Sequence, residues 1–307
     1  MKEQIFAIIE IGSNNTKTHI YKNGQVIQES TDTIEFKKNY NRDHRLNIKD
    51  IEKLYGVIEC ALNNTAMVYI FGCSIFRTLS QQELIEVNRL LEDKFHLSIR
   101  VVSQEEEALL TAYGCYSSIA YSGSICVFIG GGGSTELIFI NNGEVIGQQY
   151  FDFGVVDITK AYESLKNDVP TCNFEEVYTY VDTLLGSLEF SCDLLILAGG
   201  DHLYWYRNAN YELEKNSLYH SEKQPHMIPI EMSDHYDHDA FIISLDRIRR
   251  NSDNPLWFDG SRAMKVLTNV ISHKISAKYL IPTNINMEVG LSKKIMDGKI
   301  SFEGTGR

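Results

Sequence analysis

The sequence predicts an α/β protein with two domains built on one repeated design. One strand, loop, strand and Asn-Gly turn pattern occurs twice, and strand-like runs alternate with helical patterns over much of the chain. The length of 307 residues fits about two domains, and 43% hydrophobic residues provide enough material for two buried cores.

The repeated pattern has the composition of a phosphate-binding loop. Its first copy, residues 9–16, precedes a strand and an Asn-Gly turn at 23–24, and its second copy, residues 129–136, precedes a strand and an Asn-Gly turn at 142–143. Both copies place glycine and small polar residues after a short apolar strand, where exposed backbone N–H groups can converge on an anion. Two such hairpins suggest two half-domains that clasp one phosphate-bearing ligand.

Strands and helices are predicted in alternation along the chain. Asn47 can cap a helix whose apolar residues recur at intervals of three and four, and residues 80–83 have the form of a capping box. Further helices are expected at residues 174–188 and 262–277. The expected strands cover residues 6–11, 17–21, 25–29, 67–72, 98–102, 125–129, 137–140, 144–149 and 194–198.

The domain boundary is expected in a small, polar connector at residues 117–124. This gives an N-terminal domain at residues 1–120 and a C-terminal domain at residues 121–307. Between residues 199 and 236 the periodicity fails, so a long irregular surface segment is expected there.

Composition favours a cytoplasmic enzyme with no membrane partner. The net charge of −12 repels polyanions, so a nucleotide or polyphosphate must meet a local basic surface, and duplex nucleic acid is not expected as a partner. The N-terminal segment enters a strand without a signal-peptide pattern, and no run approaches the roughly 20 apolar residues of a membrane span. Without a CxxC pair, the cysteines are expected to be reduced. They are Cys60, Cys73, Cys115, Cys126, Cys172 and Cys192.

Three consecutive glutamates open a predicted helix at residues 103–110. Ser103 and Glu106 have the spacing of an N-cap and its reciprocal partner, which gives Glu106 a structural role. Glu107 points about 100° further around the helix and is available as a general base for water attack on phosphorus. The alternative is that all three glutamates only complement the helix dipole.

These motifs resemble those of the exopolyphosphatase and guanosine pentaphosphatase (Ppx/GppA) family, within the actin, Hsp70 and sugar-kinase superfamily. Residues 7–15 resemble a family motif that reads roughly A-x-D-x-G-S-N-S, residues 103–108 resemble S-G-x-E-E-A, and residues 129–136 resemble D-I-G-G-G-S-T-E. Shorter matches follow the family order at residues 73–77, 153–156 and 197–200. The resemblance implies two actin-like, ribonuclease H-like domains in the short two-domain form, with the active cleft between them.

The resemblance also implies hydrolysis of a terminal phosphoanhydride in polyphosphate or guanosine pentaphosphate, assisted by Mg²⁺ or Mn²⁺, in a possible homodimer. Glu107 would be the base that activates water, Glu136 a catalytic and metal-binding carboxylate, and Arg77 a phosphate ligand. This division of roles suits phosphoryl transfer, which depends on positioning and charge neutralisation. The loop residues that would bind phosphate are Gly12, Ser13, Asn14, Asn15, Gly131, Gly132, Gly133 and Ser134.

Two departures from the family pattern affect the expected metal site. Ile129 stands where the second loop of the family has an aspartate, and it can neither bind a metal nor polarise water. Glu10 stands at the aspartate of the first loop, where its extra methylene moves the charge, and about 1 Å of displacement can cost on the order of 10²-fold in rate. We hypothesise that Glu10, as a catalytic and metal-binding residue, partly replaces the lost aspartate.

Three function classes fit these observations. The first is a phosphoanhydride hydrolase, and the second is a catalytically impaired sensor that binds polyphosphate or a guanosine alarmone, which Ile129 favours. The third is an ATPase or kinase of the same superfamily, for which no specific adenosine motif is present beyond residues 199–200.

The remaining candidates have both structural and functional interpretations. The histidine-rich stretch at residues 234–238 lacks the HExxH spacing of a zinc site, so a solvated loop is expected. Trp205 can stack on a base or bury a loop. A basic stretch is either a solvated face or a landing surface for polyphosphate; it comprises Lys37, Lys38, Arg42, Arg45 and Lys49.

Overall fold

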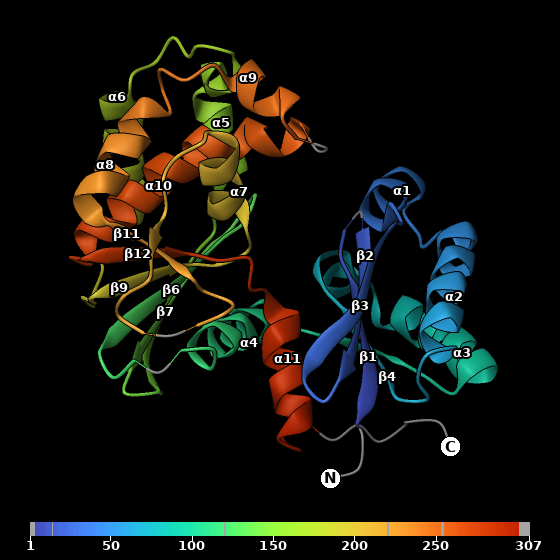
Figure 1. Ribbon diagram of the computed structural model, residues 1–307. Helices are drawn as coiled ribbons and strands as arrows, with labels where there is room; N and C mark the ends of the chain where they lie inside the picture. The colour runs from blue at the N-terminus through green and yellow to red at the C-terminus, as the bar shows by residue number, and fades with distance from the viewer. Residues whose placement is uncertain (1–3, 14, 120, 220, 253–254, 301–307) are drawn as a thin grey trace. The chain divides into compact units, whose positions relative to one another are not determined.

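The chain forms two compact units (Figure 1). The computed structural model describes residues 4–300 except 14, 120, 220 and 253–254. The first unit comprises residues 1–110 and 287–307, and the second comprises residues 111–286. The expected boundary after residue 120 differs from this division because helix α4 (Gln104–Tyr116) runs through it. The polar connector is the loop that follows α4.

The first unit contains a five-stranded sheet with the order β3-β2-β1-β4-β5. Strands β1, β2 and β3 form an antiparallel meander, and β4 and β5 continue the sheet in parallel with β1. All five strands were expected from the sequence. Their bounds are β1 (Ile5–Ile11), β2 (Asn15–Lys22), β3 (Gln25–Thr33), β4 (Val68–Gly72) and β5 (Ile99–Val101).

Both faces of β1 are buried, and each face packs against different helices. Ala7 and Ile9 pack in a cluster with residues of α2 (Ile48–Leu62) and α3 (Gln81–Phe95). Phe6 and Ile8 pack on the opposite face in a cluster that includes Met287, Leu291 and Ile295 of α11 (Met287–Met296). The C-terminal helix therefore completes the core of the first unit.

The two expected helix caps of this unit are confirmed. The Asn47 side chain accepts a hydrogen bond from the N–H of Lys49 at the start of α2. Ser80 and Glu83 form both bonds of a capping box at the start of α3. The other helices of this unit are α1 (Phe36–Asp43) and the 3₁₀ helix η1 (Ser74–Thr78).

The second unit contains a seven-stranded sheet with the order β10-β11-β12-β9-β6-β7-β8. Strands β6, β7 and β8 repeat the antiparallel meander of the first unit, and even the register irregularity recurs, after Ile20 in one copy and after Phe139 in the other. The strands are β6 (Ser124–Gly130), β7 (Thr135–Asn141), β8 (Glu144–Phe151), β9 (Leu194–Leu197), β10 (Glu214–Lys215), β11 (His226–Pro229) and β12 (Tyr279–Pro282).

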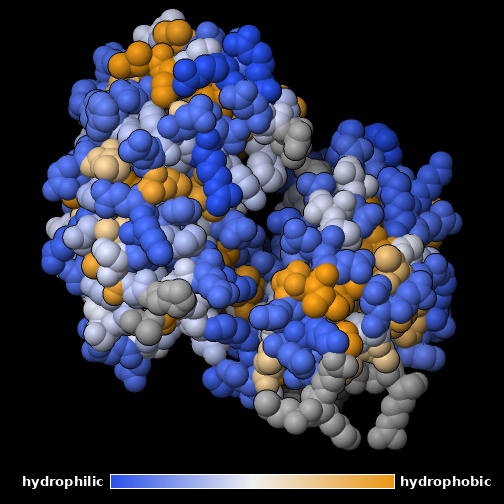
Figure 2. Space-filling model, in the orientation of Figure 1, coloured by the Kyte–Doolittle hydropathy of each residue, from blue (hydrophilic) through white to orange (hydrophobic). Residues whose placement is uncertain are grey.

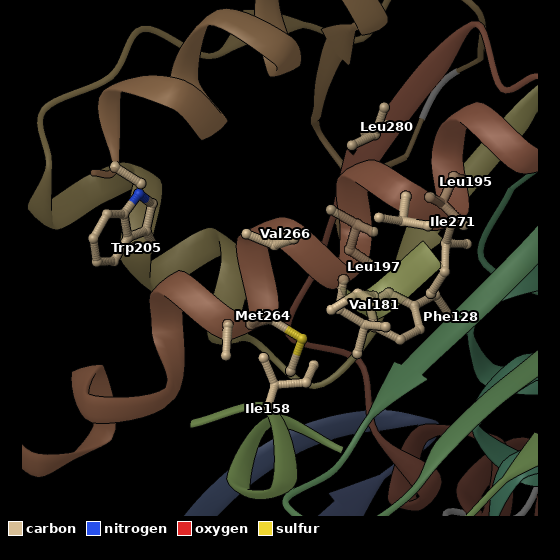
Figure 3. Packing of buried hydrophobic residues seen from close by; sticks show 14 of the residues in the cluster. Phe128, Ile158, Val181, Leu195, Leu197, Trp205, Met264, Val266, Ile271 and Leu280 are labelled. Carbon is tan, nitrogen blue, oxygen red and sulfur yellow. The ribbon is translucent and has the colours of Figure 1, made fainter. Parts of the chain in front are cut away.

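Helix α10 (Ser261–Lys274) is the central helix of the second core. Its Met264, Val266 and Ile271 lie among residues of the sheet and of α6 (Phe174–Leu185), as Figure 3 shows. Both helices were expected from their apolar spacing. The remaining helices are α5 (Val155–Ala161), α7 (Asp201–Asn208), α8 (Ile230–Asp239), α9 (Leu245–Arg250), η2 (Glu163–Lys166) and η3 (Pro255–Gly260).

The expectation of an irregular surface segment at residues 199–236 is wrong. Helix α7, strands β10 and β11 and most of α8 lie there. The apolar pattern failed because the inward faces of these helices carry aromatic and polar residues: Trp205 and Tyr206 of α7 are buried, and so is Asp237 of α8. Residues 234–238 are therefore helical, not a loop.

Hydrophilic residues cover most of the face of each unit shown in Figure 2. Apolar side chains that remain exposed include Val26 and Ile27 of β3 and Val145 and Ile146 of β8, beside the two Asn-Gly turns. Within the part of the chain that the structure describes, no helix combines the length and apolar character needed to cross a membrane.

Candidate phosphate-binding and catalytic site

The first glycine loop makes a tight turn between β1 and β2. The N–H of Gly12 donates to the carbonyl of Asn15 at 2.9 Å, and the carbonyl of Ser13 accepts from the N–H of Lys37 at 2.9 Å. The hydroxyls of Ser13 and Ser74 lie 2.5 Å apart. These bonds tie the first loop to the start of α1 and to η1.

The second glycine loop repeats the same turn between β6 and β7. The N–H of Gly131 donates to the carbonyl of Ser134 at 2.9 Å, and the carbonyls of Gly131 and Gly132 accept from the N–H groups of Val155 and Val156 at 3.1 and 2.8 Å. In a planar trans peptide the C=O and the following N–H point in opposite directions. The N–H groups of Gly132 and Gly133 therefore point away from α5, and these two glycines are exposed, as an anion site requires.

Gly154 holds this second loop in place. A Cβ atom at residue 154 would lie 2.3 Å from the carbonyl oxygen of Gly131 and 2.7 Å from the carbonyl carbon of Gly132. Only glycine allows the backbone of the loop to come this close to the start of α5.

Glu107 and Arg77 form an ion pair at the start of α4. The Nε of Arg77 also donates to the carbonyl of Val102 at 2.7 Å, which fixes the guanidinium beside the first turn of the helix. The Arg77 side chain is 26% exposed and that of Glu107 is 37% exposed. A carboxylate and a cation suited to phosphate therefore lie together, both accessible to solvent.

The neighbouring Glu106 has a structural role, as expected, but with an additional partner. Its N–H donates to the Ser103 hydroxyl at 3.0 Å, which confirms Ser103 as the N-cap. Its carboxylate forms an ion pair with Arg100 of β5. Glu106 is thus engaged in holding the start of α4 against the sheet.

Glu10 lies near the end of β1, opposite Lys17 of β2 and beside Phe71 of β4. Its Oε2 atom is buried and has no hydrogen-bond partner among the described residues. Burial raises the pKa of Glu10, and the Lys17 ammonium opposes this rise. Burial also raises the pKa of the Cys73 thiol to about 12, and the Glu10 carboxylate adds to this increase. Glu10 therefore lies near the Cys73 side chain.

The acidic residue of the first hairpin lies on its first strand, β1, whereas that of the second hairpin lies on its second strand, β7. The pair Glu10 and Lys17 of the first hairpin corresponds to the pair Ile129 and Glu136 of the second. Glu136 is only 4% exposed. Each hairpin thus retains one carboxylate at this level, on β1 in the first unit and on β7 in the second.

The donor set fits a magnesium ion only in part. An unpartnered buried carboxylate oxygen on Glu10 is the kind of ligand that Mg²⁺ takes, usually with one or two carboxylates, water and substrate phosphates. Within the described ranges, no group of three or more His, Cys, Asp or Glu side chains could hold a metal. Substrate phosphates and water would have to supply the remaining ligands.

The first unit contains six of the predicted site residues within its described part: Glu10, Gly12, Ser13, Asn15, Arg77 and Glu107. Asn15 is exposed at the start of β2, and Asn14 lies outside the described residues. Glu136 and the second loop belong to the second unit. Ser74 and Gly154 were not predicted as site residues, although both lie in segments that the family resemblance had marked.

The histidine-rich stretch has structural contacts. His238 stacks on Phe174 with ring centroids 4.1 Å apart, and His273 Nε2 lies 2.8 Å from Asp234. Trp205 is 1% exposed in the second core, which confirms its packing role. Sequence reasoning missed that Asp237 forms a buried ion pair with Lys265, at 3.7 Å.

The basic stretch begins beside the first loop. Lys37 bonds to Ser13 through its backbone, and Lys38 and Arg42 form exposed ion pairs with Glu35 and Asp43 at 2.7 Å each. Part of its positive charge is therefore locally balanced.

Each of the two α/β units carries a glycine loop at the turn of a β-hairpin. The chain belongs to the Ppx/GppA phosphatase family, whose model matches residues 16–196. This match begins directly after the first loop and includes Arg77, Glu107 and the whole second loop. No match was found among curated proteins.

Solved structures of similar proteins have the same fold. The Aquifex aeolicus PPX-GPPA enzyme is 18% identical with a TM-score of 0.75, over 95% of this chain and 99% of that chain. An exopolyphosphatase from Cytophaga hutchinsonii is 15% identical with a TM-score of 0.71, over 96% of this chain and 98% of that chain. These likenesses show that the fold is shared over nearly the whole chain.

Proposed function

We propose that this protein is a metal-assisted hydrolase of the exopolyphosphatase type, which releases terminal phosphate from inorganic polyphosphate or guanosine pentaphosphate. The observation that carries the proposal is the ion pair of Arg77 with Glu107 in a chain of the phosphatase family. A general base and a phosphate-binding cation lie side by side there.

In the proposed reaction, a terminal phosphate of the substrate binds to the Arg77 guanidinium and competes with Glu107 for it. This competition frees a carboxylate oxygen of Glu107 to accept a proton from water. The water oxygen forms a bond to the terminal phosphorus, and the bond from phosphorus to the bridging oxygen breaks. The bridging oxygen leaves on the shortened chain as an anion, and Glu107 returns its proton to solvent.

The glycine loops would supply most of the phosphate binding. N–H groups of Gly132 and Gly133 in the second loop, with that of Ser13 in the first, are suited to phosphate oxygens. Glu10 and Glu136 are the residues that would hold Mg²⁺ or Mn²⁺. When bound, the metal would neutralise negative charge on the phosphates.

A sensor that binds the same ligands without turnover is the second candidate. The observation that favours it is Ile129, which faces Glu136 in the register of β6 and β7 and leaves that position without the second acidic residue. Ile129→Asp would restore this carboxylate.

Phosphate release from polyphosphate, guanosine pentaphosphate and ATP, each with Mg²⁺ and with Mn²⁺, separates the candidates. The hydrolase proposal predicts turnover of polyphosphate or guanosine pentaphosphate by the wild type. Turnover that appears only in Ile129→Asp would contradict it and support the sensor. Turnover restricted to ATP would contradict both. Thermal shift measures binding without turnover, because a ligand that prefers the native state raises the unfolding midpoint.

A further inference from the structure

A groove in the first unit lies between the β2–β3 hairpin and α2. Its volume is about 380 Å³, within the range of small-molecule sites. Thr18 and Ile20 of β2, Gln28 and Asp32 of β3 and Lys53 of α2 are among its lining residues. We call it the β2–α2 groove. No part of the proposed hydrolase site lines it.

A buried polar atom of this groove has no hydrogen-bond partner within the described chain. Thr18 is only 6% exposed, and its hydroxyl forms no hydrogen bond among the described residues. A buried hydroxyl without a partner costs free energy, so such a group normally has a partner in its functional state. Thr18 lines the groove, so a ligand bound there can supply that partner.

In the second unit, side chains fill the space that corresponds to the β2–α2 groove. In the repeated register, Leu137 and Phe139 take the places of Thr18 and Ile20, and both are buried in the second core. Phe190 packs on Phe139 with ring centroids 4.9 Å apart. Gly147 is the counterpart of Gln28. A Cβ atom at residue 147 would lie 2.3 Å from the ring of Phe190, so this ring fills the space that a side chain would take.

The two copies therefore differ in a consistent way. The copy in the second unit closes this face with aromatic residues, and Phe151 stands there at the counterpart of Asp32. The copy in the first unit has polar side chains and an open volume. On α2, Gly56 adds to this opening, because a Cβ atom there would meet nothing within 4 Å.

Asp32 of β3 and Lys53 of α2 are the charged residues among those that line the groove. No ion pair within 4.0 Å joins Asp32 to Lys53 in the described part of the chain. The groove therefore offers an anion and a cation that are not bound to each other.

Apolar side chains line part of the groove. Ile20 of β2, Ile34 after β3, and Val57 and Ala61 of α2 are all at most 7% exposed. A ligand that matches this surface carries opposite charges and an apolar group. An α-amino acid with an aliphatic side chain has this form.

We propose that the β2–α2 groove is a binding site for a small zwitterion of the amino-acid type, with its ammonium toward Asp32, its carboxylate toward Lys53 and its aliphatic group against Ile20 and Val57. The Thr18 hydroxyl gains a hydrogen-bond partner from the head group. This site is separate from the proposed hydrolase chemistry and does not depend on it.

Cys60 provides a direct readout, because it lines the groove and is exposed. Its alkylation by iodoacetamide is followed by peptide mass spectrometry in the full-length protein with L-leucine. The controls lack one feature each: 3-methylbutylamine has no carboxylate, 4-methylpentanoate has no ammonium and glycine has no aliphatic group. Cys172 of the second unit, which is partly buried, is the internal reference.

L-leucine should slow the alkylation of Cys60 about tenfold at about ten times its Kd and leave Cys172 unchanged. The three control compounds should protect Cys60 less than L-leucine does at the same concentration. Asp32→Asn should abolish the protection, whereas Glu29→Gln, which removes the same charge from the other face of β3, should retain it. Gly56→Leu should block the groove in a folded protein, because its side chain enters open space.

Three results would overturn the proposal. One is no protection of Cys60 by L-leucine at millimolar concentrations. Another is equal protection in Asp32→Asn and the wild type. The third is stronger protection by a neutral polyol such as myo-inositol, which would assign the groove to hydroxyl recognition. Phosphate release is measured in parallel, so failure of this proposal is distinguishable from failure of the hydrolase proposal.

Discussion

Glu10 combines an unfavourable position for folding with a chemistry suited to a cation. Its raised pKa means that the folded state favours the protonated carboxyl, so the ionised form costs stability as pH rises above the unfolded pKa. This cost grows until pH reaches the folded pKa and is constant above it. A bound cation would offset it.

Glu10→Gln should therefore stabilise the metal-free protein at pH 7 and weaken its affinity for Mg²⁺. The gain over wild type should increase with pH from about 4.5, by up to about 1.4 kcal/mol per pH unit, and then level off. Denaturant unfolding at several pH values and Mg²⁺ titration measure the two effects. Glu29→Gln, exposed on β3, is the control. Unchanged Mg²⁺ affinity would contradict a metal-binding role for Glu10.

At the scale of single residues, the sequence predicted which side chains belong to the candidate site better than it predicted which side chains they contact. The motif resemblance predicted Arg77 and Glu107 as site residues, and the two form an ion pair. Their pairing depends on η1 meeting the start of α4, and the residues are 30 positions apart, beyond the reach of local patterns. The buried pair of Lys265 and Asp237 was missed for the same reason, because the charges lie on two different helices.

The two glycine loops are the elements on which the proposed phosphate binding depends. The second loop keeps its shape through the close approach of Gly154 to Gly131, which no other residue permits. The first loop has the same internal hydrogen bond and is held by η1 and α1 instead. The shared turn was predictable from composition, whereas the different supports were not.

Gly154→Ala should destabilise the second unit by about 1–3 kcal/mol, because its Cβ would overlap the backbone of the second loop. It should also weaken phosphate binding. Gly133→Ala is the matched control, because a Cβ there meets nothing within 4 Å, and its unfolding free energy should change little. Thermal unfolding measures the effect on stability, and binding of tripolyphosphate measures the effect on phosphate affinity. Equal stability of the two variants would contradict this role for Gly154.

Strands and helices were predicted correctly where their buried apolar residues recur at regular intervals. The meanders, the capped helices α2 and α3, and the helices α6 and α10 match the expected residues closely. Helices α7 and α8 were missed because their buried faces include His202, Tyr206 and Asp237, so no apolar stripe marks them. When polar groups are buried and paired inside a core, the helix lacks the apolar periodicity from which helices are predicted.

At the scale of the whole molecule, the chain returns to its first unit at the end. Met287, Leu291 and Ile295 recur at intervals of four, as in a helix with one apolar face, but this spacing does not reveal the partner of that face. The partner is the surface of β1 formed by Phe6 and Ile8. A boundary drawn from linker composition therefore missed that the first unit is discontinuous.

The acidic charge of the whole molecule makes the basic stretch at residues 37–49 the expected contact for a long polyanion. Arg42→Glu with Arg45→Glu should raise the KM for long polyphosphate on the order of tenfold at low salt, with less effect at high salt. The KM for tripolyphosphate should change little, because a short substrate does not reach the stretch. Steady-state phosphate release with both substrates tests this. An unaltered KM for the long chain would exclude a landing role.

The most direct test of the account compares phosphate release by the wild type, Glu107→Gln and Glu105→Gln. Glu105 is an exposed neighbour in the same helical turn and carries the same charge near the helix start. The account predicts that Glu107→Gln lowers kcat by about 10²–10⁴-fold with little change in stability, whereas Glu105→Gln retains nearly full activity. Full activity of Glu107→Gln, or an equal loss in both variants, would contradict the assignment of Glu107 as the base.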